Sequence, residues 1–480
     1  MEGALAVTAA VAVMSGAALL ALLALGADAV APLSRLVPAV VSLAFGGGID
    51  LSADLAAKGG ASGLLGMFGG GGGIGLGVAG QVSAMPLMLT FLGAAVLGWS
   101  FFRPLRRRTR PAPALLIART GGALGAAAVV VPVLAALARG SLSLPESVSE
   151  RLGKGGGPGG GLGKLTGGGG ISSVDFATDV VLTGLLAVIE VALVIGLGCV
   201  AARRTSLPGP VALSRARLKW NPVASTLTGI FTALYTVALL LALLAGGAAA
   251  TGRAQAAKAA GALLLAAPNL ISAVLTSGLG ASWQAGLERR QPEGGGMMGG
   301  LGGLGGFGGM GGAGGLGGAN GADAGSRQTD LSGKAVAGLP LWLIGLTVLA
   351  CLLVYAGHRA AARTPSRTAR EEADALLGRH LELALRAGVA VGLCVLFLGL
   401  VSQVSVGIGF SLMGNEMGGM DAGLDGSVRL PALTGFLLAG LACYAGSRLH
   451  AARTGTGPDR DRARTQVRGV SSRTSSRPRE

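Results

Sequence analysis

The residue that stands out chemically is Glu190, which lies in the middle of an apolar run at 179–201. A carboxylate at that depth in a bilayer is costly, and such residues often serve proton relays or ion paths. We expect Glu190 to relay protons or coordinate a cation, with Arg119 or Arg386 near the ends of neighbouring helices as its partner. The equal alternative is a protonated or hydrogen-bonded glutamate with a structural role.

Three further site candidates interrupt apolar runs. Pro38 lies within the run at 31–46, and Pro268 and Asn269 lie within the run at 259–283. A matched pair of broken hydrophobic segments is typical of binding sites in transporters. The alternative is that both segments only fill gaps between helices.

The remaining polar residues do not form a catalytic set. The histidines His358, His380 and His450 lie in arginine-rich flanks, and no HExxH, GxSxG or CxxC motif occurs. The glycine tracts produce chance GxGxxG matches that indicate no nucleotide site. Asp421 and Asp425 are too few for a calcium cage. We therefore expect no enzyme activity, no catalytic residue, no cofactor and no metal site.

The composition is that of a membrane protein. Hydrophobic residues make up 51% and charged residues 13% of the 480 positions, and the mean hydropathy is +0.63. A soluble domain carries about 25% charged residues. The net charge of +16 would suggest nucleic acid in a soluble protein. Here the basic residues flank apolar runs, so we expect the lipid bilayer to be the partner and expect no nucleic acid.

Eight apolar runs have the length of about 20 residues that a helix needs to cross a bilayer. They cover 4–26, 84–102, 114–138, 179–201, 222–246, 338–357, 384–405 and 430–447. These runs predict an all-α polytopic protein with eight transmembrane helices. We expect the two proline-broken segments, 31–46 and 259–283, to re-enter the membrane rather than cross it, since a crossing would reverse the sidedness of later arginines.

Basic residues cluster after every second run. The four clusters are Arg103, Arg106, Arg107, Arg108 and Arg110; Arg203, Arg204, Arg215, Arg217 and Lys219; Arg359, Arg363, Arg367, Arg370 and Arg379; and nine arginines from 448 onward. The positive-inside rule places these clusters, and both termini, in the cytoplasm. The clusters should also attract anionic lipid headgroups.

Short matches recur in the same order along the chain and predict two duplicated membrane halves, 1–216 and 217–452. A basic tail, 453–480, follows and is expected to be disordered. Both halves have an even number of spans, so they should enter the membrane in the same orientation. The matches pair Pro38–Ser42 with Pro268–Ser272, Ala84–Leu89 with Gly338–Leu343, and Arg119–Gly121 with Arg386–Gly388.

Glycine-rich tracts fill the segments expected outside the cell. The chain has 88 glycines, and residues 294–318 contain 17 of them in 25 positions. Similar tracts occur at 66–80, 153–170 and 414–426. So much glycine favours disorder, because ordering it costs backbone entropy. The alternative is that these segments pair as strands with one another or with another chain.

The repeats, the glycine-rich outer loops and the Ala-Ala-Arg exits at 201–205, 361–364 and 451–454 make the whole chain resemble the streptophobe family, multi-pass membrane proteins of streptomycetes. The resemblance implies a plasma-membrane protein without an assigned activity and transfers no site residue. We expect a non-catalytic envelope or membrane scaffold whose loops meet the cell wall or other proteins. The alternative is a permease-like transporter with its site between the halves.

Overall fold

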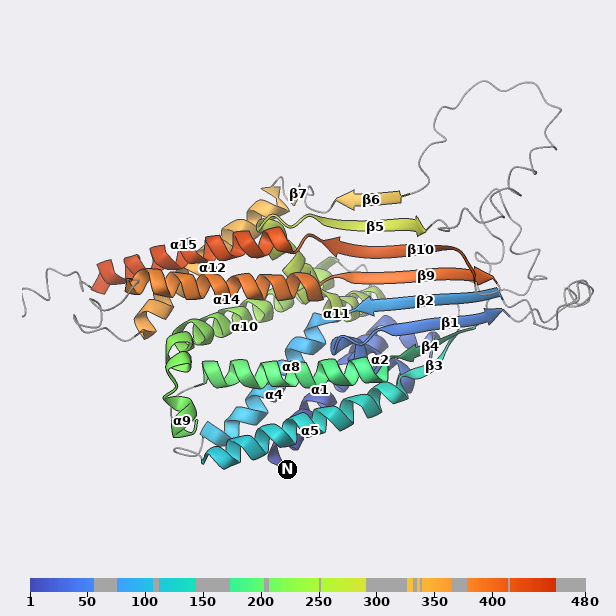
Figure 1. The fold of residues 1–480 in the computed structure, drawn as a ribbon. Helices are drawn as coiled ribbons and strands as arrows, with labels where there is room; N and C mark the ends of the chain where they lie inside the picture. The colour runs from blue at the N-terminus through green and yellow to red at the C-terminus, as the bar shows by residue number, and fades with distance from the viewer. Residues whose placement is uncertain are drawn as a thin grey trace, which may run out of the picture.

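The structure is a computed structural model, and it shows a bundle of long helices with a β-sheet at one end (Figure 1). It describes residues 1–55, 76–106, 112–143, 173–202, 207–249, 252–290, 326–330, 335–336, 339–364, 378–412 and 415–454. The following sections concern these residues.

Nine helices in the described part of the chain are long and apolar enough to cross a membrane. They are α1 (Glu2–Leu25), α4 (Leu87–Arg106), α5 (Pro113–Leu137), α8 (Val180–Ala201), α10 (Arg215–Ala249), α11 (Arg253–Gly278), α12 (Leu341–Arg363), α14 (Arg379–Val401) and α15 (Arg429–Thr454). Each of the eight predicted runs overlaps one of them. The chain is therefore a multi-pass helical membrane protein.

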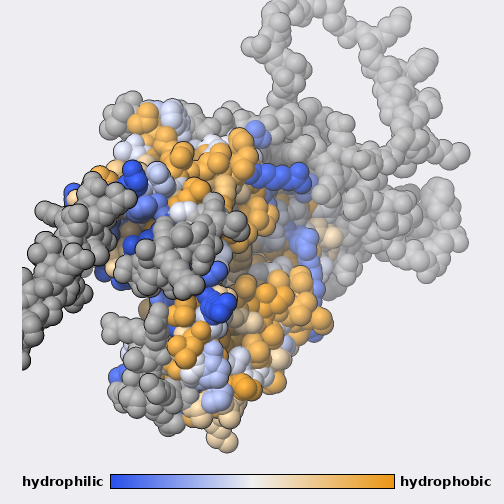
Figure 2. Space-filling model, turned by 60° about the vertical axis from the view of Figure 1, so that its left-hand side comes forward, coloured by the Kyte–Doolittle hydropathy of each residue, from blue (hydrophilic) through white to orange (hydrophobic). Residues whose placement is uncertain are grey.

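The outer surface of the bundle fits a bilayer. Large apolar side chains are exposed along its helices, among them Ile117, Val181, Leu244 and Leu441. Figure 2 shows such side chains gathered over one face of the bundle. An apolar surface this extensive is a liability in water but is favourable against lipid tails.

The helices pack through glycines where two backbones approach closely. A Cβ on Gly357 of α12 would overlap the backbone of Cys443 in α15, and a Cβ on Gly446 would overlap the carbonyl of Val354. Small residues at helix contacts are a common way to bring membrane helices together, since lipid supplies no hydrophobic drive for their association.

An eight-stranded antiparallel sheet corrects the all-α prediction. Its strands are β1 (Ile49–Leu55), β2 (Leu76–Ala84), β3 (Arg139–Ser143), β4 (Ser173–Thr178), β5 (Trp283–Arg290), β6 (Ser326–Asp330), β9 (Val404–Leu412) and β10 (Asn415–Gly426). They follow the order β3-β4-β1-β2-β9-β10-β5-β6. A second, two-stranded sheet pairs β7 (Ala335–Val336) with β8 (Leu339–Pro340).

The strands form because the segments between the helices alternate in polarity. At the centre of the sheet, Val82 pairs with Val406 on one side and with Ile49 on the other, while the neighbouring Gln81 pairs with Gly407 and Asp50. One face is therefore apolar and the other polar, which is typical of an antiparallel sheet. The expected disorder is wrong for 76–80 and 415–426, which lie in β2 and β10. The tracts 153–170 and 294–318 lie outside the described residues.

The two prolines do not break their segments. Pro38 lies inside α2 (Leu33–Ala44) and Pro268 lies inside α11, both of which are continuous helices. Proline removes one helical hydrogen bond, but contacts with neighbouring helices keep each segment in shape: α2 packs against α1, α4 and α5, and α11 packs against α1, α4, α10 and α12. The short helices η1 (Ala27–Ala29) and α9 (Gly209–Ala212) complete the helical part.

We predict that Gly357→Ala lowers the free energy of unfolding by about 2–3 kcal/mol, because the added methyl would force α12 and α15 apart. The measurement is the thermal unfolding midpoint of the purified protein in detergent. Gly229→Ala in α10 is the matched control, since a Cβ there meets nothing within 4 Å. Equal midpoints for the two variants would contradict the close contact.

Candidate functional site

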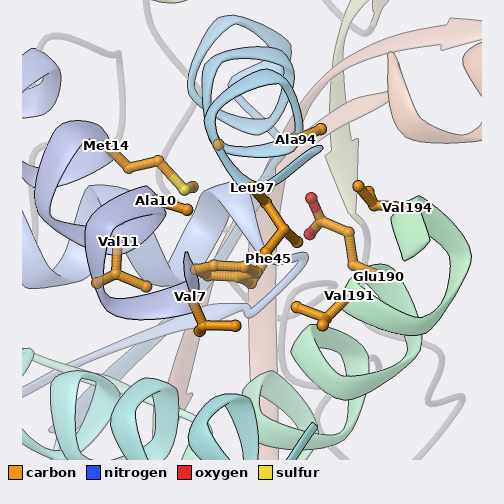
Figure 3. Close-up of a pocket in the computed structure, with 11 residues that line it drawn as sticks. Val7, Ala10, Val11, Met14, Phe45, Ala94, Leu97, Glu190, Val191 and Val194 are labelled. Atoms are coloured by element: carbon orange, nitrogen blue, oxygen red, sulfur yellow. The ribbon is translucent and has the colours of Figure 1, made fainter. Parts of the chain in front are cut away.

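Glu190 lies in the middle of α8 and points into a small pocket among four helical segments (Figure 3). The pocket is bordered by α1, α4, α8 and Phe45, the residue that follows α2. Its lining is apolar apart from Glu190: Val7, Ala10, Val11, Met14, Phe45, Gly93, Ala94, Leu97, Val191 and Val194. All of these residues belong to the first predicted half of the chain.

The Glu190 carboxylate lacks hydrogen-bond partners among the residues that line this pocket. Its Oε2 atom is buried and has no hydrogen-bond partner among the described residues. The free space is about 20 Å³, which is enough for one water molecule. An ionised carboxylate without a partner is costly in such surroundings. The pocket can therefore hold a proton or a single water, but it has no room for an organic substrate in this conformation.

The two arginines proposed as partners of Glu190 lie elsewhere. Arg119 is buried, donates to Glu2 Oε2 at 2.9 Å and to the Ser100 carbonyl at 3.1 Å, and lies over the Phe101 ring. This pairing ties α5 to the start of α1. The predicted pairing of Arg119 with Glu190 is therefore not observed.

Arg386 forms an ion pair with Glu382 one turn earlier in α14 and donates to the Lys219 carbonyl at 2.9 Å. It ties α14 to the beginning of α10. The four-residue spacing of Glu382 and Arg386 is a local signal for this ion pair on a helix. The contact with the Lys219 carbonyl depends on the packing of α14 against α10, which the sequence does not show. Arg386 is thus also engaged away from Glu190.

Asn269 joins parts of the chain that are far apart in sequence. Its side-chain amide donates to the Met85 carbonyl at 2.9 Å and accepts a hydrogen bond from the Leu87 backbone N–H at 3.1 Å. The second contact satisfies a donor in the first turn of α4 that has no helical partner. Asn269 therefore links α11 to the junction of β2 and α4.

The prolines are not part of the Glu190 pocket. Pro38 is buried within α2. The residue after it, Ala39, belongs to a buried apolar cluster with Phe176 of the sheet. The carbonyl of Pro268 accepts a hydrogen bond from Ser272 Oγ at 2.8 Å, and Ser272 Oγ lies 2.7 Å from Tyr235 Oη. The six predicted site residues thus do not converge on one place.

Arginine side chains cap two of the helix ends remote from the sheet, those of α8 and α12. Arg217 donates to the carbonyls of Cys199, at 2.8 Å, and of Ala202, at the end of α8. Arg379 donates to the Thr364 carbonyl at 2.7 Å, just past the end of α12. Cations at helix C-termini satisfy free carbonyls and favour the helix dipole. Part of the predicted arginine clusters therefore has a structural role.

The polar face of the sheet is a feature that our sequence analysis missed. Register places Asp50 opposite Gln81, and Asp175 opposite Ser52, on this face. Asp421 lies opposite Gly407 on the same face. The signal was present as a two-residue alternation of apolar and polar residues in segments such as 49–55 and 404–412.

Among the described residues, no group of three or more histidine, cysteine or acidic residues converges as a metal site would require. His358 and His450 meet edge to face with ring centres 4.9 Å apart. No known family model, curated protein or solved structure matches the chain.

We predict that Glu190→Leu raises the free energy of unfolding by about 1–3 kcal/mol, because it removes a buried acceptor that lacks a partner. The thermal unfolding midpoint in detergent measures the change. Thr434→Leu is the matched control: Thr434 corresponds to Glu190 when Cys199 is aligned with Cys443, and its hydroxyl donates to the Leu430 carbonyl at 3.1 Å. We expect the control to lower the midpoint. A lower midpoint for Glu190→Leu would show that the carboxylate is satisfied.

We predict that Asn269→Leu lowers the free energy of unfolding by about 2–3 kcal/mol, since it leaves the Met85 carbonyl and the Leu87 N–H without their partner. The neighbouring Leu270, which is 52% exposed, provides the control Leu270→Ala, for which we expect a smaller loss. Thermal unfolding of both variants in the same detergent tests this. If Asn269→Leu is as stable as the unchanged protein, the amide does not link α11 to α4.

Proposed function

We propose that this chain is a non-catalytic scaffold of the cytoplasmic membrane that presents its eight-stranded sheet outside the cell as an interaction surface for the envelope. The observation that carries the proposal is that the sheet draws four strands from each predicted half and lies at one end of the helix bundle. With the helix bundle in the bilayer, a large sheet at that end would project beyond the lipid.

The positions of the basic residues support the proposed orientation. Helices α4, α8, α12 and α15 lead away from the sheet into segments rich in arginine. The positive-inside rule favours the cytoplasm for those segments and for both termini, and hence the outside for the sheet. In this orientation the arginine clusters face the anionic lipids of the inner leaflet.

The duplication into halves 1–216 and 217–452 is part of the proposal, with 453–480 as a basic tail. Its support is the order of elements. The first half runs α1, α2, β1, β2, α4, α5, β3, β4, α8; the second runs α10, α11, β5, β6, α12, α14, β9, β10, α15. The short helices η1 and α9 and the small β7–β8 pair have no counterpart among the described residues. Strand order within the sheet repeats in the same way, as β3-β4-β1-β2 and β9-β10-β5-β6.

We also propose that α2 and α11 do not cross the membrane. At 12 residues α2 is short, since a crossing takes about 20. Contacts along α11 support the same reading: Gly261 approaches the last turns of α1, Asn269 reaches the start of α4, and Gly278 lies against Leu346 near the start of α12. These contacts all involve the sheet ends of their helices, so α11 would begin and end on one side.

The glycine-rich segments fit the same picture by their place in the sequence. Residues 56–75 join β1 to β2, 144–172 join β3 to β4, and 291–325 join β5 to β6. We propose that these connections, together with the polar face, meet cell-wall polymers or other envelope proteins. We also propose that the chain is a member of the streptophobe family, which it resembles in sequence layout.

A proton-coupled permease is the second candidate function, and the unpartnered carboxylate of Glu190 is the observation that favours it. Such a group beside room for one water has the chemistry of a proton relay. The size of the pocket and its place within the first half support the scaffold instead, because a permease site is expected between the halves.

Complementation of a knockout strain separates the two functions. Gly80→Leu should distort the sheet, since a Cβ at Gly80 would lie 2.9 Å from the Gly407 carbonyl oxygen, and it leaves the pocket intact. For a scaffold we expect Gly80→Leu to abolish rescue of envelope-stress resistance, and Glu190→Gln to rescue fully. Gly98→Leu is the control, because a Cβ there meets nothing within 4 Å. Loss of rescue by Glu190→Gln alone would favour the permease.

A further inference from the structure

The two edges of the sheet are formed by strands whose counterparts pair at its centre. The order β3-β4-β1-β2-β9-β10-β5-β6 places β3 at one edge and β6 at the other. If the second half repeats the first, β9 corresponds to β3 and β2 corresponds to β6. The central pair of β2 with β9 lies within one chain. By the same correspondence, β6 of one copy and β3 of another can form an equivalent pair.

The central pair shows how the two halves join. It extends from Leu76 opposite Leu412 to Ala84 opposite Val404 with no register shift. Ser83 Oγ and Ser405 Oγ lie 2.8 Å apart across it. In the central pair, the last strand of the first half in the order of the sheet, β2, pairs with the first strand of the second half, β9. The corresponding strands at the two edges, β6 and β3, have no strand on their outer side in the described part of the chain.

We propose that a second copy of this chain extends the sheet, with β6 of one copy pairing antiparallel with β3 of the next. The proposal rests on the proposed function, because it requires the duplication and an outer sheet. This contact is heterologous, because it joins two different edges. Repeated contacts of this kind form a closed ring if the rotation between neighbouring copies permits it, and otherwise an open row. Copies in one membrane share their orientation, as the two halves of a single chain would.

The charges at the edges favour this pairing. Arg139 begins β3 directly after α5, so it lies at the bundle end of its strand. Asp330 ends β6 and pairs with Gln284 near the start of β5, which is also the bundle end. An antiparallel pair brings these two ends together, and opposite charges across strands are favourable. The short, polar edge strands would also discourage pairing with unrelated strands.

The contact between copies should be weaker than the contact between halves. Within one chain, the hydrogen bonds of the Asn269 amide to Met85 and Leu87 add to the strand pairing between the halves. The corresponding position in the first half, next to Pro38, is Ala39, which has no polar side chain. We therefore expect the assembly to persist in a bilayer, where the copies share a plane, and to dissociate more readily in detergent.

The test is crosslinking in native membranes. In a chain whose cysteines Cys199, Cys351, Cys394 and Cys443 are replaced by alanine, Ser141→Cys and Gln328→Cys place one thiol on each edge strand. A short bismaleimide, which tolerates a shift of register, should convert the double variant into covalent dimers and higher multiples of the 46.8 kDa chain. Each single variant should stay monomeric, because like edges do not meet.

Three results would overturn the proposal. These are the absence of crosslinked multiples, crosslinks in either single variant, and a crosslink confined within one chain. Labelling of the same Ser141→Cys variant on intact cells with a membrane-impermeant maleimide tests separately whether the sheet lies outside the cell. If the label reacts and no multiples form, only the pairing of copies fails; if the label does not react, the outer sheet and the proposed function fail with it.

A measurement on the unchanged protein protects the test against variants that do not fold. The full chain extracted directly into lipid nanodiscs should give one mass class that contains at least two copies, as measured by mass photometry. Dilution into detergent should shift this class towards single chains. A single chain per nanodisc under conditions that preserve the helix bundle would overturn the proposal.

Discussion

A bilayer offers the peptide backbone no hydrogen-bond partner, and the rest of this structure depends on that constraint. Within the apolar runs the chain is helical, so that each N–H and C=O is satisfied inside its own segment. The exceptions fall at helix ends, where side chains supply the missing partners. Asn269 satisfies the first turn of α4, and Arg217 and Arg379 satisfy the ends of α8 and α12. The sheet begins only where the helices stop.

The same constraint explains why glycine serves two purposes in one chain. In the bundle, Gly357 and Gly446 let α12 and α15 come into backbone contact. In the sheet, Gly77, Gly80, Gly407 and Gly409 lie within the central pair of strands, where backbone pairing across the strands supplies the order that glycine-rich sequence lacks by itself. Ordering glycine costs entropy, and here pairing among eight neighbouring strands offsets that cost.

Glu190 and the sheet support the two proposed functions, a permease and a scaffold, on different grounds. The carboxylate is a polar group in an apolar pocket within one half of the chain. The sheet is an extended surface to which both halves contribute. A relay needs a connected path of polar groups, but Arg119 and Arg386 form ion pairs with Glu2 and Glu382 and not with Glu190. An interaction surface needs only shape and charge, which the sheet has.

The sequence by itself determined the membrane-spanning helices, because crossing lipid requires about 20 apolar residues in a row and that property is local. Each of the eight runs predicted from it overlaps a helix, and Glu190 stands in the middle of α8 as expected. The tertiary structure alone decided the rest. Whether 49–55 and 404–412 become strands depends on partners far away in the chain, and whether α2 and α11 stay continuous through proline depends on the helices beside them. The acid that Arg119 reaches was likewise decided by packing, since Glu2 lies in a distant segment and such contacts leave no mark in local spacing.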